Sequence, residues 1–171
     1  AAIALNQAKQ RGRGGLCRFA RDMEQETRVR VRLLQELRRA TELNQLFMVY
    51  QPQLNLATRQ IVGVEALLRW RNSAGQLVSP ADFIPLAENS GLITSIGDWV
   101  LNQACQDWQR LQALGAPPVR MAVNVSVVQL RQPDFIKRVD AAIAKSGITP
   151  TQLELEVTES MAMLDTSVIV E

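Results

Sequence analysis

The sequence contains no histidine, and this absence excludes several kinds of functional site. Histidine is the commonest general base and a common ligand of zinc, copper and iron. The only two cysteines, Cys17 and Cys105, stand far apart in unrelated contexts, so we expect neither a disulfide framework nor a cysteine-rich metal knuckle. Any catalysis must therefore depend on carboxylates, lysine, amides or hard cations.

The sequence also lacks a long uninterrupted apolar run. A transmembrane helix needs about 18 such residues, and charged side chains interrupt every apolar stretch before that length. The first residues do not combine the basic start, apolar middle and small-residue cleavage site of a secretory signal. We therefore expect no membrane span in this segment and a cytoplasmic location.

The composition is that of an ordered chain with an uneven charge distribution. Of the 171 residues, 47% are hydrophobic, which excludes intrinsic disorder. Residues 1–44 hold ten of the 19 basic side chains and five of the 17 acidic ones. A basic segment can indicate nucleic-acid binding, but here the arginines follow a helix-like stretch that contains glutamates and no interleaved aromatics. A solvated linker helix is the preferred interpretation, and no nucleic-acid partner is expected.

The hydrophobic pattern predicts alternating helices and strands. Helices are predicted at residues 22–43, 80–90, 96–114 and 135–146, and strands at residues 46–50, 61–70, 120–127 and 153–158. In the first helix, the predicted apolar stripe consists of Val31, Leu34, Leu37 and either Ala40 or Thr41. Pro52 is expected to end the first strand, and the polar turn at 55–60 favours a hairpin with the second. Helices between the later strands imply parallel pairing, so the predicted fold class is α/β, either a barrel or a doubly wound sheet.

Three predicted strands carry a metal-competent oxygen side chain near their C-terminal ends, namely Glu65, Asn124 and Glu156. Burying such groups is costly unless they are paired, hydrogen-bonded or bound to a cation. Their intervals are close to one and two repeats of the ~31-residue unit of an eight-unit barrel, which would place them at one mouth. Two carboxylates and an amide suit Mg²⁺ or Mn²⁺ better than zinc. Spacing alone also permits ordinary salt-bridged strand residues, and Arg69 fits either a phosphate contact or a structural ion pair.

Five segments occur in a characteristic order: YQP at 50–52, VEALLRW at 64–70, SPADFIPLAE at 79–88, NVS at 124–126 and EVTES at 156–160. Together they resemble the first half of an EAL domain, the bacterial cyclic-di-GMP phosphodiesterase. The resemblance implies a TIM-barrel-like fold, a modified β/α barrel whose first strand is antiparallel to the rest, represented here by its N-terminal half. It also implies hydrolysis of cyclic di-GMP to linear pGpG.

The same resemblance assigns roles to individual residues. Glu65, Asn124 and Glu156 correspond to metal ligands, with two Mg²⁺ or Mn²⁺ ions expected in the complete domain. Glu159 corresponds to the carboxylate that steadies a loop over the metals, and Glu65 and Glu159 are the expected catalytic residues. Substrate contacts are expected from Gln51, Leu68 and Arg69. The implied mechanism is two-metal activation of a water for in-line attack on phosphorus.

Residues 1–19 resemble the end of a GGDEF domain, a diguanylate cyclase, through the run ALNQAKQRGR at 4–13. The predicted organisation is a GGDEF-like remnant at 1–19, a connector helix at 20–43 and the N-terminal half of an EAL domain at 44–171. The resemblance also implies a homodimer formed through the EAL domain.

The family's later Asp-Asp-Phe-Gly segment and catalytic lysine do not occur before Glu171. We therefore expect residues 1–171 alone to be inactive and poorly folded. The alternative function is that of a degenerate EAL module, which binds cyclic di-GMP or mediates dimerisation without cleaving the nucleotide.

Overall fold

The computed structural model describes residues 21–157. Its helices are α2 (Arg21–Ala40), α3 (Pro80–Ser90), α4 (Leu92–Ala113), α5 (Val127–Leu130), α6 (Phe135–Ser146) and the 3-10 turn η1 (Pro150–Gln152). Its strands are β1 (Leu46–Leu54), β2 (Ile61–Arg71), β3 (Leu77–Val78), β4 (Arg120–Asn124) and β5 (Leu153–Glu156). The GGDEF-like run at 1–19 and the predicted catalytic Glu159 lie outside the described residues.

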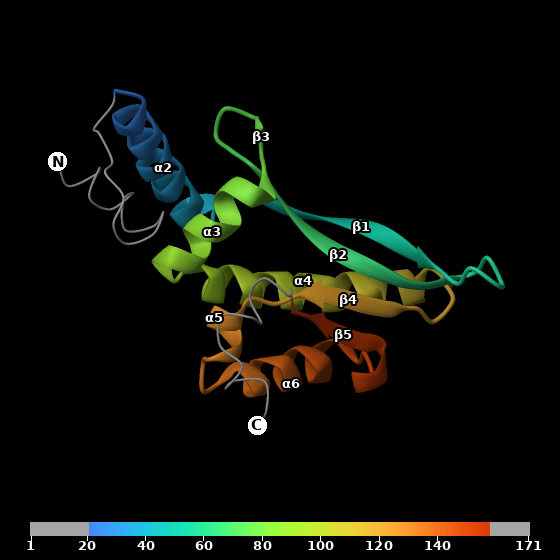
Figure 1. The fold of residues 1–171 in the computed structure, drawn as a ribbon. Helices are drawn as coiled ribbons and strands as arrows, with labels where there is room; N and C mark the ends of the chain where they lie inside the picture. Colours follow the sequence, from blue (N-terminus) through green and yellow to red (C-terminus); the bar gives the residue numbers. More distant parts are fainter. Residues whose placement is uncertain (1–20, 158–171) are drawn as a thin grey trace, which may run out of the picture.

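The strands form one mixed sheet in the order β1-β2-β4-β5, with the short β3 paired to β2 (Figure 1). Strand β1 is antiparallel to β2, whereas β2, β4 and β5 are mutually parallel. Parallel strands need a crossover connection, which α3 and α4 supply between β2 and β4, and α5 and α6 supply between β4 and β5. The predicted α/β class and the antiparallel first strand are therefore confirmed.

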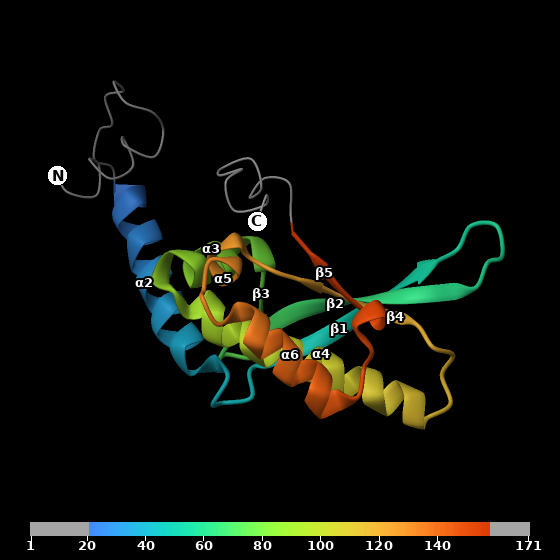
Figure 2. The same cartoon turned by 90° about the horizontal axis from the view of Figure 1, so that it is seen from below.

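Helices α4 and α6 cover one face of the sheet (Figure 2). Side chains alternate between the two faces of a strand, so only every second residue can reach the helices. Ala66 and Trp70 of β2, and Met121 and Val123 of β4, are buried in the core on this face. The intervening residues therefore point to the opposite face, which leaves that face available for a site.

Strand β1 continues through Pro52, contrary to the prediction that this proline would end it. Pro52 is the Cα partner of Val64 in the β1–β2 ladder. A proline is tolerated here because β1 lies at the edge of the sheet that residues 21–157 form, with no described strand paired on its outer side. The longer hairpin extends beyond the rest of the sheet (Figure 1).

Helix α2 contacts the core with a different stripe from the one predicted. Leu37 and Ala40 are buried as expected, and Leu33 packs against them, but Val31 is 51% exposed. A helix repeats every 3.6 residues, so positions 33, 37 and 40 share one face, while an apolar pattern taken at intervals of three drifts away from it.

Helices α3 and α4 meet at Gly91, whose φ of 78° lies in the left-handed region. The predicted start and end of α3 are confirmed, since Pro80 begins the helix and Gly91 follows its last residue. Helix α4 begins at Leu92, four residues before the predicted Ile96, because Gly91 is also its N-cap. No helix within residues 21–157 has both the length and the apolar content needed to cross a membrane.

Candidate functional site

Glu65, Asn124 and Glu156 lie on three adjacent parallel strands, Asn124 and Glu156 as the last residues of β4 and β5 and Glu65 in the middle of the longer β2. Asn124 is the Cα partner of Glu156 across the β4–β5 ladder, and Glu65 is paired with Ala122 across β2–β4. The side-chain Nδ2 of Asn124 donates a hydrogen bond of 2.7 Å to Oε1 of Glu65. The structure therefore brings together the three oxygen-bearing residues that were predicted as metal ligands.

The backbone next to Asn124 continues the ladder beyond the end of β4. The amide N–H of Val125 donates a 2.8 Å hydrogen bond to the carbonyl oxygen of Glu156. Val125 is also buried in the core, so alternation directs the side chain of Asn124 to the opposite face. The ladder and the core together determine where Asn124 stands relative to Glu156.

The two carboxylates of this cluster influence each other electrostatically. The pKa of Glu156 is raised, first by burial and then by the negative charges of Glu65 and Glu154. A cation at this position would relieve the repulsion, so the cluster fits a bound metal ion. Within residues 21–157 no group of three or more His, Cys, Asp or Glu side chains is arranged as a metal site, so the donors here are two carboxylates and one amide. Such hard oxygen donors suit Mg²⁺ or Mn²⁺.

Gln51 and Arg69, both predicted substrate contacts, share the face that carries Glu65. Gln51 is the direct antiparallel partner of Glu65. Arg69 lies four residues after Glu65 on the same strand, and its guanidinium donates a 2.9 Å hydrogen bond to the carbonyl oxygen of Leu68. Among the described residues Arg69 forms no ion pair, so the salt-bridge alternative left open by the sequence is not observed there.

A cavity of about 260 Å³ lies beside this cluster, between the end of β2 and helices α3, α4 and α5. Leu68 and Arg69 line one part of it and Asn124 lines another, which places two predicted substrate contacts and one predicted metal ligand around a single cavity. Glu88, Ser126 and Gln129 also line this cavity, although the sequence analysis assigned them no role. Glu88 and Ser126 belong to the segments SPADFIPLAE and NVS, whose resemblance to the EAL domain could have marked both residues as candidates.

Tyr50 anchors β1 to the helical face next to Gln51. Its hydroxyl donates a 2.5 Å hydrogen bond to Oδ2 of Asp107 in α4, and Asp107 also accepts hydrogen bonds from Gln103 and Arg110. Burial, followed by the interaction with Asp107, raises the pKa of Tyr50 well above its usual range. Because Tyr50 points toward the helices, the next residue, Gln51, points toward the cluster.

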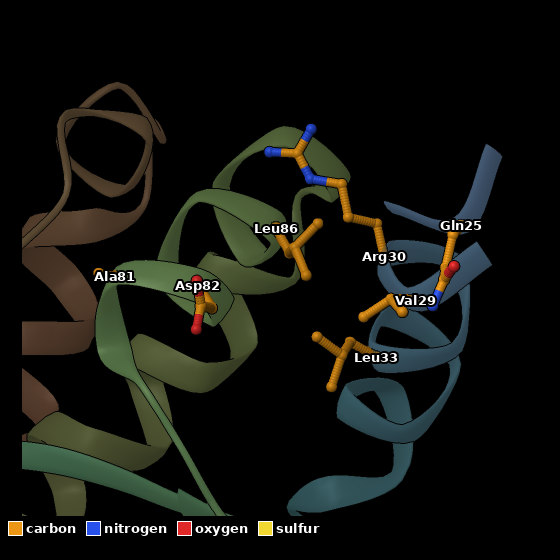
Figure 3. Close-up of a pocket in the computed structure, with 7 residues that line it drawn as sticks. All are labelled: Gln25, Val29, Arg30, Leu33, Ala81, Asp82 and Leu86. Atoms are coloured by element: carbon orange, nitrogen blue, oxygen red, sulfur yellow. The ribbon is translucent and has the colours of Figure 1, made fainter. Parts of the chain in front are cut away.

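A separate groove of about 690 Å³ lies between α2 and α3 (Figure 3). Val29 and Leu33 of α2 point across it toward Leu86 of α3, while Arg30 and Asp82 supply its charged groups. None of the predicted site residues lines this groove. It is larger than the cavity beside Asn124, but it lacks the converging oxygen donors, so we place the functional site at the strand ends.

Comparison with known proteins gives consistent matches. The EAL domain family profile matches residues 34–169. The bifunctional diguanylate cyclase/cyclic di-GMP phosphodiesterase MucR of Pseudomonas aeruginosa is 40% identical over 162 residues, which cover 95% of this chain and 24% of that protein. The cyclic di-GMP phosphodiesterase NbdA of the same organism is 37% identical over 163 residues, which cover 95% of this chain and 21% of that protein. The chain thus spans between a fifth and a quarter of the length of these two relatives.

The fold of the chain is also similar to that of solved phosphodiesterase and EAL-domain structures. The phosphodiesterase of P. aeruginosa MucR, in complex with c-di-GMP, aligns with a TM-score of 0.74 and 41% identity over 79% of this chain and 55% of that one. The Xanthomonas citri FimX EAL domain in complex with c-di-GMP aligns with a TM-score of 0.71 and 26% identity over 85% of this chain and 56% of that one.

Proposed function

The chain belongs to the EAL domain family, and on this basis we propose that it supplies part of the active site of a cyclic-di-GMP phosphodiesterase, which hydrolyses cyclic di-GMP to linear pGpG. The expected TIM-barrel-like fold, in its N-terminal half, is confirmed by the likeness to solved EAL domains. The observation that carries the functional proposal is the contact between Asn124 and Glu65, with Glu156 adjacent on the next strand.

The proposed metal ligands are Glu65, Asn124 and Glu156, with two Mg²⁺ or Mn²⁺ ions in the complete site. Ions of this kind, when bound, activate a water and neutralise charge on the transferring phosphoryl group. Burial raises the pKa of Glu156 first, and the negative charges of Glu65 and Glu154 raise it further, so a cation bound here would stabilise the charged carboxylate. Glu65 is also proposed as a catalytic residue, because as a metal ligand it would hold the ion that activates the water.

The substrate carries two phosphodiester groups, and the proposed contacts match this chemistry. Arg69 has a planar guanidinium that suits the oxygens of a phosphate, and Gln51 is held opposite Glu65 by the β1–β2 register. Leu68 lines the adjacent cavity and supplies an apolar contact. Glu159, outside the described residues, remains the proposed carboxylate that steadies a loop over the metals.

The proposed organisation is that of a tandem GGDEF–EAL protein, with α2 as the connector helix. The match to MucR covers 95% of this chain, whereas the EAL profile begins at residue 34, so the similarity extends into the segment before the EAL domain. The side chains of Arg28 and Arg32 are both 77% exposed and pair with Glu24 and Glu36 at i,i+4 spacing, as on the solvated face of a helix. A homodimer formed through the EAL domain is part of the same proposal.

A chimera tests the proposed catalysis directly. Residues 34–169 would replace the matching segment of the P. aeruginosa MucR phosphodiesterase domain, and hydrolysis of cyclic di-GMP would be followed with Mn²⁺ present. We expect pGpG to form, and we expect a chimera carrying Glu65→Gln to form none while remaining folded. A chimera that binds cyclic di-GMP normally but releases no pGpG would instead support the degenerate binding module.

A further inference from the structure

Three polar side chains form a connected network directly after Asn124, and the proposed function gives them no role. The hydroxyl of Ser126 donates a 2.7 Å hydrogen bond to Oε1 of Glu88, which lies in α3. The backbone N–H of Ser126 donates a 3.1 Å hydrogen bond to Oε1 of Gln129 in α5. We refer to Glu88, Ser126 and Gln129 as the Ser126 network.

Gln129 is an unusual residue to bury, since its side chain is polar and only 6% of the residue is exposed. It completes a reciprocal capping box, in which the Ser126 hydroxyl accepts a 3.2 Å hydrogen bond from the backbone N–H of Val128. Because a buried amide without partners would be costly, these contacts strongly favour one arrangement of the turn. The turn is therefore tied to α3 through Glu88 and to α5 through Gln129.

Helix α4 provides the space that Gln129 occupies. A Cβ atom added at Gly97 would lie 1.9 Å from Nε2 of Gln129 and 2.5 Å from its Cδ. Such a contact is impossible without displacing the side chain, so the absence of a side chain at Gly97 is required for the network as observed. Helix α4 therefore packs closely against the turn that follows β4, with Gly97 next to the Gln129 side chain.

The turn controls the approach of Asn124 to the metal site. Asn124 is exposed, and its hydrogen bond to Glu65 is its one side-chain bond within the described residues, so packing does not hold the side chain in place. Its direction must come from the backbone, which is fixed on one side by the β4–β5 ladder and on the other by Ser126.

We propose that Glu88, Ser126 and Gln129 are positioning residues, which hold the Asn124 amide in the direction needed to contact Glu65 and to bind the metal ion. This inference rests on the proposed function. Removing a residue that orients a metal ligand without itself binding the metal typically weakens metal affinity by about 10- to 100-fold.

Two measurements on the full chain test the proposal. The first is the NMR signal of the Asn124 side-chain amide in the metal-free protein, which reports its hydrogen bond to Glu65. The second is the affinity for Mn²⁺ measured by calorimetry. The informative variants are Glu88→Ala, which removes the acceptor of the Ser126 hydroxyl, and Gly97→Ala, which displaces Gln129.

We expect both variants to shift the Asn124 amide signals toward those of a free amide and to weaken Mn²⁺ binding roughly tenfold. Glu88→Gln keeps an oxygen acceptor for Ser126 and should stay within about twofold of the unsubstituted protein. Arg110→Ala is the matched control, because it removes an ion pair with Asp107 that also lies in α4, but 13 residues or about 20 Å along the helix from Gly97. It should leave both readouts unchanged.

The proposal is overturned if Glu88→Ala leaves the Asn124 signals and the Mn²⁺ affinity unchanged, or if Arg110→Ala changes them equally. Failure of the unsubstituted chain to bind Mn²⁺ would mean that Glu65, Asn124 and Glu156 do not hold the ion without the rest of the domain. In that case the Asn124 amide signals, which need no metal, would still decide whether the Ser126 network positions the side chain.

Discussion

Asn124 and Glu65 stand 59 residues apart in the chain, yet the amide of the first donates a 2.7 Å hydrogen bond to the carboxylate of the second. The contact is possible because β2 and β4 are adjacent parallel strands. It uses the amide nitrogen of Asn124 and leaves the amide oxygen as the atom that would bind a cation. This pair therefore forms the centre of the proposed site.

Removing the charge of Glu65 should remove metal binding. We expect Glu65→Gln to weaken Mn²⁺ binding by at least about tenfold, because affinity for a hard cation depends on the number of charged oxygen ligands. Calorimetric titration of the purified chain measures this effect. The matched control is Glu154→Gln, since Glu154 belongs to β5 but forms an ion pair with Arg120 at 3.2 Å. Equal losses in both variants would indicate general surface charge instead of a defined site.

The Tyr50–Asp107 hydrogen bond should contribute measurably to stability. We expect Tyr50→Phe to lower the free energy of unfolding by about 1.5–3 kcal/mol, the range for a hydrogen bond to a charged acceptor. Denaturation with urea provides the measurement. Asp107 retains Gln103 and Arg110 in this variant, so the carboxylate is not left unpaired. A variant as stable as the original protein would show that this bond contributes nothing.

Tyr50 should also make stability depend on alkaline pH. Its pKa is raised in the folded protein, so its contribution is complete below the unfolded value of about 10 and is lost as the pH rises above it. Tyr50 is the only tyrosine in the chain, so the ultraviolet absorbance of tyrosinate reports this group alone. We expect no tyrosinate signal at pH 11 while the protein remains folded, and a smaller loss of stability between pH 9 and pH 11 in Tyr50→Phe. A folded protein that titrates near pH 10 would contradict the prediction.

The aromatic pair Trp70 and Phe83 should be among the most sensitive positions in the core. Both side chains are fully buried, and their rings meet edge to face with centroids 5.7 Å apart at an interplanar angle of 81°. We expect Phe83→Ala to cost roughly 3–5 kcal/mol of unfolding free energy, from lost apolar burial and the cavity it leaves. Leu77→Ala serves as the control, because Leu77 is 62% exposed and its loss should cost less than about 0.5 kcal/mol.

Local signals in the sequence were sufficient for several elements. Ser79, Pro80 and Gly91 predicted the ends of α3 because caps, a first-turn proline and a left-handed glycine act within a few residues. The four-residue helix α5 was missed, since it is too short to show a periodic pattern and is held by the contacts of Ser126. Pro52 was misjudged because its tolerance depends on β1 being an edge strand, and sheet order is not a local property.

Some residues of the candidate site could also be found from the sequence, whereas others could be found only from the structure. Glu65, Asn124 and Glu156 were identified from residue type and spacing, because carboxylates and amides in otherwise apolar strands carry a cost that needs an explanation. The contacts of Glu88 and Gln129 with Ser126 were not predictable from their neighbours in the chain. Their contacts with Ser126 join α3, β4 and α5, and the space for Gln129 comes from Gly97 of α4.

Sequence alone was enough to indicate the α/β class, the family resemblance and the oxygen donors of the candidate site, because these follow from residue types and short-range periodicity. Tertiary structure decided which of those side chains meet, that Arg69 forms no ion pair among the described residues, and which side chains contact Ser126 next to Asn124. The physical reason is that strand register and helix packing join residues far apart in the chain, and their contact energies depend on distances that no local pattern specifies.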